Sequence, residues 1–405
     1  MSTPKENGPV SPTPKCSSAF TPKKALVLGK FSRYEFEKHR NPNLNEEEFS
    51  ESLELRGSDY KSLLYHHNIH VKNRDHIAEC LKKRNIEAKV VNRFSYTEDL
   101  INWADMIITS GGDGTYLMAA SKIVNSMKPL IGVNSDPTRS VGHLCLPNKY
   151  SSNFDKALDL MLNGQFEWQF RQRIRVTLEG QNAFADPTEL HDQQLMHPEY
   201  RFLEIEQFKK PTPPPVSTTT TPKRVLPFRA LNEVFIGESL SSRVSYFEMS
   251  INSKERFKIK SSGVTICTGT GSTSWSFNIN KLTPQCVKDL FRIVNEECFA
   301  SSTEKDKLNP EDSQLVQKVT DRFNNSLIYP PSQPSMAYTI RDPVVFGTNF
   351  SSKPRDFAKR IVVRSRMTDA HIVIDGGLSY SFNDGARAIF DIHEEDALRT
   401  ITLKP

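Results

Sequence analysis

The spacing of apolar residues changes near residue 150, and this change limits the possible fold more than any other feature. Before it, short apolar runs alternate with segments of helical period, a pattern typical of a parallel sheet covered on both faces. After it, every second residue is apolar, as in "EWQFRQRIRVTLEG", a pattern typical of half-buried strands. The sequence therefore predicts an α/β domain over residues 23–148 and a mostly β domain over residues 149–384. In the first domain we expect strands at 23–30, 87–94, 104–110 and 129–137, and helices at 73–85 and 115–127.

Three segments follow neither pattern. Residues 1–22 are rich in Ser, Thr, Pro and Lys, which predicts a disordered tail. This tail lacks the apolar centre of a secretory signal, and without arginine or amphipathic spacing it is a poor transit peptide. The Pro- and Thr-rich residues 209–224 predict a disordered linker. Residues 284–330 are polar with helical spacing, which predicts a helical insertion.

Composition excludes several functional classes. The 405 residues carry a net charge of +5, which suggests a local basic pocket for an anion and no nucleic-acid surface. The six cysteines form no CxxC pair, as expected of reduced intracellular thiols without disulfides or a zinc site. No apolar run approaches the ~18 residues of a membrane-spanning helix, so no membrane partner is expected.

The strongest candidate site is the stretch "SGGDGT", between an expected strand and an expected helix. Gly111, Gly112 and Gly114 would let a phosphate chain approach the main chain and the N-terminus of the helix that includes Thr115. An ordinary tight turn capped by Asp113 is the alternative. A carboxylate repels phosphate, so it is useful there only if it accepts a proton from a hydroxyl or holds Mg²⁺. The stretch therefore predicts a site of phosphoryl transfer.

Two further clusters contribute polar groups. Asn134, Asp136 and Arg139 follow the fourth expected strand, at the end of a parallel strand where ligands bind in open α/β sheets. Asn232 and Glu233 lie between apolar residues and offer the hydrogen-bonding groups that suit a ribose diol, although a polar turn would look the same.

The stretch "TICTGTGSTSWSFN" places several hydroxyls around bare glycines. Thr268, Thr270, Gly271 and Ser272 could contact phosphates or the edge of a base, and a glycine bulge in a β domain is the alternative. Asp375, in "VIDGG", could be a turn residue or a site acid, and the local sequence does not decide between them.

The histidines of "HHNIH" have spacings that metal sites use. No acid or cysteine with matching spacing accompanies His66, His67 and His70, so a solvated loop is the favoured interpretation.

Taken together, three ordered motifs resemble those of the NAD kinase family. They are Gly111-Gly112-Asp113-Gly114-Thr115, Asn232-Glu233, and "TGTGSTSW" from Thr268 to Trp275. The similarity extends from residue 23 to the end and is greatest to the mitochondrial-type members. One departure is Gly269, which stands where the family has proline.

The resemblance implies a Rossmann-like N-terminal domain and a C-terminal β-sandwich, with the last strand, at about residues 385–405, returning to the first domain. It implies transfer of the ATP γ-phosphoryl group to the 2′-hydroxyl of the adenosine ribose of NAD, with Mg²⁺ carried by ATP. A homodimer or larger homo-oligomer and a mitochondrial location would follow, although a cytoplasmic one is compatible with the N-terminal tail. Asp113 would be the general base, and phosphate would lie at Gly111, Gly112 and Gly114. NAD would be held by Asn232 and Glu233. The adenosine of NAD would lie near Thr270, Gly271 and Ser272.

Two alternatives remain open at this stage. Lipid kinases of the diacylglycerol or sphingosine type also use a GGDGT turn, but their Asn-Glu pair follows it almost at once. A non-catalytic NAD-binding protein could keep the same fold, although it would have no use for Asp113.

Overall fold

The computed structural model describes residues 20–124, 126–195, 221–299, 307–344 and 353–403. The expected tail at 1–22 and linker at 209–224 lie mostly outside these residues. The linker as predicted is too long at its end, because residues 223 and 224 already belong to a strand.

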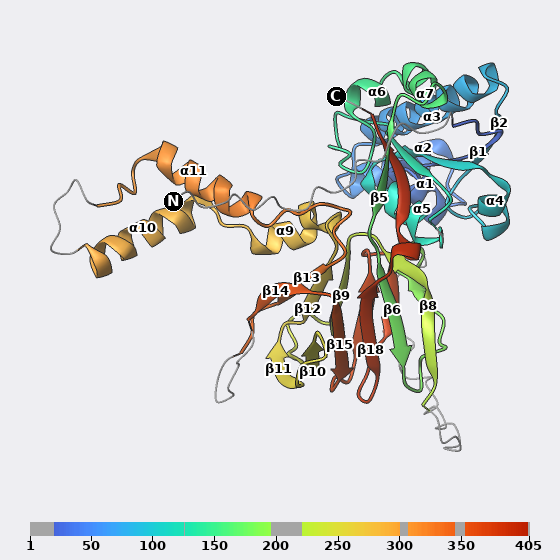
Figure 1. Ribbon diagram of the computed structural model, residues 1–405. Coiled ribbons are helices and arrows are strands. Elements are labelled where there is room, and N and C mark those ends of the chain that lie inside the picture. The colour runs from blue at the N-terminus through green and yellow to red at the C-terminus, as the bar shows by residue number, and fades with distance from the viewer. Residues whose placement is uncertain (1–19, 125, 196–220, 300–306, 345–352, 404–405) are drawn as a thin grey trace, which may run out of the picture.

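A four-stranded parallel sheet with the order β2-β1-β3-β4 forms the centre of the N-terminal domain (Figure 1). Its central strands are apolar along almost their whole length because helices cover both faces. In β1, Ala25 and Val27 face the core shared with α3 (Tyr60–Lys83) and α7 (Phe154–Leu162). Leu26 and Leu28 face the core shared with α4 (Glu98–Trp103) and α5 (Asp113–Ser121). The strands are β1 (Lys24–Gly29), β2 (Glu87–Val91), β3 (Met106–Gly111) and β4 (Leu130–Asn134).

Seven helices of the described residues belong to this domain, and five of them, α1, α2, α4, α6 and α7, were not expected. The expected domain boundary at residue 148 is too early, because α7 packs in the core of this domain. Residues 33–55 are mostly polar, yet they form α1 and α2, which begin at capping boxes formed by Ser32 with Glu35 and by Asn45 with Glu48. The helices are α1 (Arg33–Arg40), α2 (Glu46–Leu55), α3 (Tyr60–Lys83), α4 (Glu98–Trp103), α5 (Asp113–Ser121), α6 (Asn148–Ser151) and α7 (Phe154–Leu162).

The C-terminal domain is a sandwich of two sheets around one apolar core. The six-stranded sheet has the order β11-β10-β15-β18-β6-β8, and the seven-stranded sheet has the order β14-β13-β12-β9-β16-β17-β7. The first sheet contains β6 (Ile174–Glu179), β8 (Lys223–Ala230), β10 (Ser245–Ile251), β11 (Phe257–Ser261), β15 (Arg360–Ser365) and β18 (Arg387–Ile392). The second contains β7 (Thr188–Glu189), β9 (Glu233–Glu238), β12 (Val264–Cys267), β13 (Met336–Ile340), β14 (Arg355–Ala358), β16 (Ala370–Ile374) and β17 (Leu378–Ser381). The expected fold class, an α/β domain followed by a β-sandwich domain, is confirmed.

The helices of the second domain lie outside the sandwich. In Figure 1, α10 and α11 project away from both domains, and they pack on each other through Val287, Phe291 and Val316. They lie within the expected insertion at 284–330. The helical elements are α8 (Leu190–Leu195), η3 (Gly271–Thr273), α9 (Trp275–Asn280), α10 (Pro284–Cys298), α11 (Ser313–Asn325) and η4 (Glu394–Asp396).

Two strands connect the domains. β5 (Glu167–Arg171) pairs antiparallel with β19 (Leu398–Thr402), and β19 lies beside β4, where the Thr400 hydroxyl donates to the Leu130 carbonyl at 2.7 Å. The expected boundary of the returning strand, at about residue 385, is too early because β18 still belongs to the sandwich.

Candidate active site

The glycine turn joins β3 to α5, with Gly112 as the N-cap and Asp113 as the first helical residue. A Cβ atom on Gly111 would lie 2.3 Å from the Thr115 hydroxyl, so the turn closes only around a bare residue. A Cβ atom on Gly114, in contrast, would meet nothing within 4 Å. The main chain at Gly114 is therefore open to an approaching ligand.

Asp113 is held by two main-chain donors. Its Oδ1 accepts from the Leu144 N–H at 2.9 Å, and its Oδ2 accepts from the His143 N–H at 3.1 Å. The N-terminus of α5 adds a favourable potential for negative charge. Each carboxylate oxygen keeps a free lone pair, so a fixed and half-buried carboxylate can still accept a proton.

A cavity of about 320 Å³ opens beside this turn. Lys30 and Arg139, which have no ion-pair partner among the described residues, line it together with Arg33 and Gly112. Three cations around a bare turn at a helix N-terminus form a site for a polyanion. The remaining lining residues are His70, Asn134, Ser135, Asp136 and Ser140.

The structure gives Asn134 and Asp136 supporting positions in this cavity. The Asn134 amide donates to the Ser140 carbonyl at 2.7 Å, and the Asp136 carboxylate accepts from the Thr138 hydroxyl and is bonded to His66 at 2.8 Å. Burial favours a higher pKa for Asp136, but the hydrogen bonds from Thr138 and His66 outweigh it and hold the pKa below its usual value. Asp136 is thus an ionised anchor for the loop that carries Arg139.

The interpretation of "HHNIH" as a solvated loop is wrong. The segment lies within α3, where His66 contacts Asp136 and the buried His70 is bonded to the Ser135 hydroxyl at 2.8 Å. Burial and then the charge of Lys30 lower the pKa of His70 to about 4, so this ring is neutral near pH 7. In the described part of the chain, no group of three or more His, Cys, Asp or Glu side chains is placed to hold a metal ion.

The turn of Asn232 and Glu233 depends on Asp375. The Asp375 carboxylate accepts from the main-chain N–H groups of Leu231, Asn232 and Glu233 at 2.7, 2.8 and 3.0 Å. The Leu231 side chain in turn packs in the core shared with Tyr116 of α5. The ambiguous Asp375 is therefore a turn residue that fixes the Asn-Glu pair against the first domain.

Two polar atoms of this pair are buried and have no hydrogen-bond partner among the described residues. They are Asn232 Oδ1 and Glu233 Oε2, on side chains of residues that are only 5% and 9% exposed. Burial, with a smaller contribution from the charge of Asp375, raises the pKa of Glu233 to about 8. A buried polar atom without a partner is costly, so this pair is available for a ligand.

The hydroxyl-rich stretch supports the same turn from the other side. The Thr268 hydroxyl donates to the Leu231 carbonyl, and the Ser272 hydroxyl donates to the Gly269 carbonyl at 2.7 Å. A Cβ atom on Gly271 would lie 2.2 Å from the Asn232 carbonyl oxygen. These groups therefore form the packing behind the Asn-Glu pair.

A second cavity, of about 240 Å³, lies between the loop that follows β4 and the strands β5 and β19. It is lined by Leu144, which bonds Asp113, and by Arg171, which donates to the Thr270 hydroxyl at 3.4 Å. The Arg171 Nε atom is buried and has no hydrogen-bond partner in the described part of the chain. Arg171 therefore connects the wall of this cavity to the hydroxyl-rich stretch.

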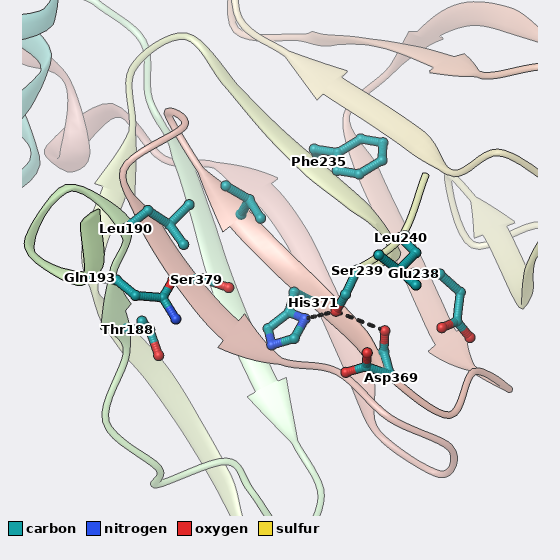
Figure 2. A pocket seen from close by; sticks show the side chains of 12 residues that line it. Thr188, Leu190, Gln193, Phe235, Glu238, Ser239, Leu240, Asp369, His371 and Ser379 are labelled. Carbon is teal, nitrogen blue, oxygen red and sulfur yellow. Dashed lines mark hydrogen bonds between the residues drawn. The ribbon is translucent and has the colours of Figure 1, made fainter. Parts of the chain in front are cut away.

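A third cavity, of about 470 Å³, lies apart from all of these residues. It is on the seven-stranded sheet, where His371 is bonded to the Ser239 hydroxyl at 2.8 Å with Phe235 above them (Figure 2). None of the expected site residues lines it.

Several functional candidates were missed from the sequence, notably Lys30, Arg33 and Arg171. Lys30 and Arg33 follow the carboxyl end of β1, so the rule that placed polar residues after β4 would have found them. Arg171 follows no comparable rule, because its position depends on the pairing of β5 with β19.

Comparison with known proteins identifies the family. Residues 46–166 match the model of the ATP-NAD kinase N-terminal domain. The chain is 45% identical over 393 residues to "NAD kinase 2, mitochondrial" of Homo sapiens, covering 96% of this chain and 86% of that protein. The protein of the same name from Xenopus tropicalis is 42% identical over 406 residues, and this match covers 96% of this chain and 92% of that protein. The solved structure of an NAD kinase from Archaeoglobus fulgidus in complex with ATP is 17% identical in sequence, with a TM-score of 0.48. The superposition covers 94% of this chain and 93% of that chain.

The human and Xenopus relatives identify the chain as an ATP-dependent phosphotransferase. It belongs to the NAD kinase family. This membership decides against a lipid kinase. In addition, no helix in the described part of the chain is both long and apolar enough to cross a membrane.

Proposed function

We propose that this NAD kinase transfers the γ-phosphoryl group of ATP to the 2′-hydroxyl of the adenosine ribose of NAD. The proton of the hydroxyl passes to the Asp113 carboxylate, and the 2′-oxygen forms a bond to the γ-phosphorus. The bond between this phosphorus and the β–γ bridging oxygen breaks, giving NADP and ADP. The observation that carries the proposal is the Asp113 carboxylate, fixed by two N–H donors beside a cation-lined cavity.

The ATP phosphates occupy the cavity beside the glycine turn. Lys30 and Arg139 supply positive charge there, and the main chain of Gly112 and Gly114 with the N-terminus of α5 supplies N–H donors. Asn134 and Asp136 hold the loop that carries Arg139 in place.

NAD binds against the Asn232-Glu233 turn. The partnerless Asn232 Oδ1 accepts from the ligand, and Glu233, protonated near pH 7, donates to it. The cavity between Leu144 and Arg171 takes the adenosine, next to Thr270. In this assignment Thr268, Gly271 and Ser272 shape the pocket through the packing described above.

Magnesium enters with ATP as part of the substrate. The described residues offer no cluster of metal ligands, and the oxygens of Asp136 are already engaged by Thr138 and His66. The ATP phosphates therefore hold the ion, which supplies charge neutralisation at the transferred group.

The direct test is incubation of the purified chain with NAD, ATP and MgCl₂, followed by chromatography and ³¹P NMR of the product. The proposal requires ATP-dependent formation of NADP phosphorylated at the 2′-position. Binding of NAD without any NADP would instead support the non-catalytic alternative.

We further propose a mitochondrial homodimer. The location is supported by the human and Xenopus relatives, which are named as mitochondrial proteins, and the dimer is supported by the family resemblance. Light scattering should give twice the 46.1 kDa of one chain. The full chain with a fluorescent protein at its C-terminus should enter mitochondria; a diffuse signal would contradict this location.

A further inference from the structure

The chain crosses between the domains twice, and one side chain bridges the two crossings. The first crossing joins β5 to β6 through residues 172 and 173, and the second joins β18 to β19 through η4. In Figure 1, β5 and β19 run side by side from the sandwich to the first domain. Arg173 lies in the first crossing, and its Nε donates to the main-chain carbonyl of Asp396 in the second.

Arg173 is a fully buried cation, with 0% of the residue exposed. Its remaining hydrogen bonds go to main-chain carbonyls at the C-terminal end of α5. Nη1 donates to Ala120 at 3.0 Å and to Ile123, and Nη2 donates to Val124 at 3.2 Å. The guanidinium thus joins the last turn of α5 to the segment just beyond its end, and it adds a donor to the Ala120 carbonyl, which also accepts from the Ile123 N–H at 3.2 Å. Burial lowers the pKa of Arg173 to about 10, which still leaves the side chain charged near pH 7.

Both ends of α5 carry the charge that its dipole favours. Asp113 is negative at the N-terminus, and Arg173 is positive at the C-terminus. The helix has nine residues, so these ends are about 12 Å apart. A short helix of this length moves as a rigid rod, and its C-terminal end determines where its N-terminal end points.

We propose that Arg173 is a positioning residue that ties α5 to both domain crossings and thereby holds Asp113 in its reactive place. The inference rests on the proposed role of Asp113. On a rod of about 12 Å, a tilt of about 5° moves the far end by about 1 Å. A displacement of about 1 Å far from the chemistry can cost roughly 10²-fold in rate. Arg173 is fully buried and lines none of the cavities described above, so we expect the loss to fall on kcat and not on substrate binding.

Arg173→Lys keeps the charge but loses the planar fork that reaches several carbonyls. The matched control is Arg175→Lys, two residues further along in β6, because Arg175 bonds the carboxylates of Asp396 and Glu395 and has no hydrogen bond to α5. We expect Arg173→Lys to lower kcat 10- to 100-fold while KM for ATP and NAD stays within threefold. Arg175→Lys should keep kcat within threefold, even if its melting temperature falls. An equal kcat loss in both variants, or an Arg173→Lys loss confined to KM, would overturn the proposal.

Hydrogen exchange of the unmodified protein tests the coupling even if Arg173→Lys fails to fold. In mild urea, the amides of residues 118–124 and those of residues 172–176 should exchange with the same free energy of opening, because the Arg173 side chain joins the two segments. Opening of the α5 end at lower urea than the crossing would contradict the coupling. This measurement needs no activity. A chain that makes no NADP but shows joint opening would refute the proposed function while leaving the coupling intact.

Discussion

Gly271 and Gly114 belong to two of the motifs that the sequence associates with nucleotide binding. In the structure Gly271 is tightly packed against the main chain of Asn232, whereas Gly114 has open space around it. A Cβ atom on Gly271 would lie 2.2 Å from the Asn232 carbonyl oxygen and 2.6 Å from its carbon. Ordinary contacts begin at 3.4 Å, so the Asn232 turn would have to retreat by about 1 Å. The same carbonyl accepts from the Thr268 N–H at 2.9 Å, so the retreat also breaks this hydrogen bond.

The expected cost of Gly271→Ala follows from these two effects. Overpacking costs about 1–3 kcal/mol, and the lost hydrogen bond adds about 1 kcal/mol. For a domain of this size, a loss of about 3 kcal/mol lowers the melting temperature by roughly 6–12 °C. Because Asn232 moves with its carbonyl, KM for NAD should rise while KM for ATP stays within threefold.

Gly114→Ala is the matched control for stability. Its Cβ atom meets nothing within 4 Å, and alanine is favoured over glycine in a helix by about 1 kcal/mol. This variant should melt at the same or a higher temperature and lose affinity for ATP, whose phosphates need the bare main chain. A melting temperature for Gly271→Ala within 1 °C of the unmodified protein would refute the packing argument.

The remaining predictions concern charged groups of the site. The pKa of Glu233 is raised from 4.5 to about 8 on folding, so the stability that this carboxyl contributes is present below about pH 4.5 and is lost as the pH rises through 8. In chemical denaturation between pH 5 and 9, the free energy of unfolding of Glu233→Gln should therefore rise relative to that of the unmodified protein; a constant difference across this range would contradict the pKa shift. Lys30→Met should raise KM for ATP about 10- to 100-fold with KM for NAD unchanged in initial-rate kinetics, because a charged hydrogen bond contributes about 1.5–3 kcal/mol; the opposite pattern would exchange the two pockets. Asp375→Asn leaves one of three main-chain donors without an acceptor, so KM for NAD should rise about tenfold; no change in that constant would remove Asp375 as the anchor.

The parts of the fold that sequence predicts well are those governed by apolar periodicity. The strands β1, β3 and β4 lie at or near their expected places because buried parallel strands are apolar on both faces. Helices α1 and α2 were missed because few of their residues are buried, although the capping signals Ser32-x-x-Glu35 and Asn45-x-x-Glu48 are legible in the sequence.

The site was predictable only in part, because hydroxyl groups and histidines look the same whether they bind ligands or main chain. The Thr268 and Ser272 hydroxyls donate to carbonyls of their own domain, and His66 fixes Asp136 across a sequence distance of 70 residues. The Asp375 anchor likewise acts over 142 to 144 residues, a separation that local sequence patterns do not report.

The most direct test of the account is the rate of NADP formation by Asp113→Asn under saturating NAD and MgATP. Asparagine keeps the size of the side chain and can still accept one of the N–H bonds from residues 143 and 144, but it cannot take the ribose proton. The account predicts a kcat lowered by roughly 10²- to 10⁴-fold with NAD binding retained in calorimetry. A variant that turns over at the full rate would contradict the assignment of Asp113 as the general base.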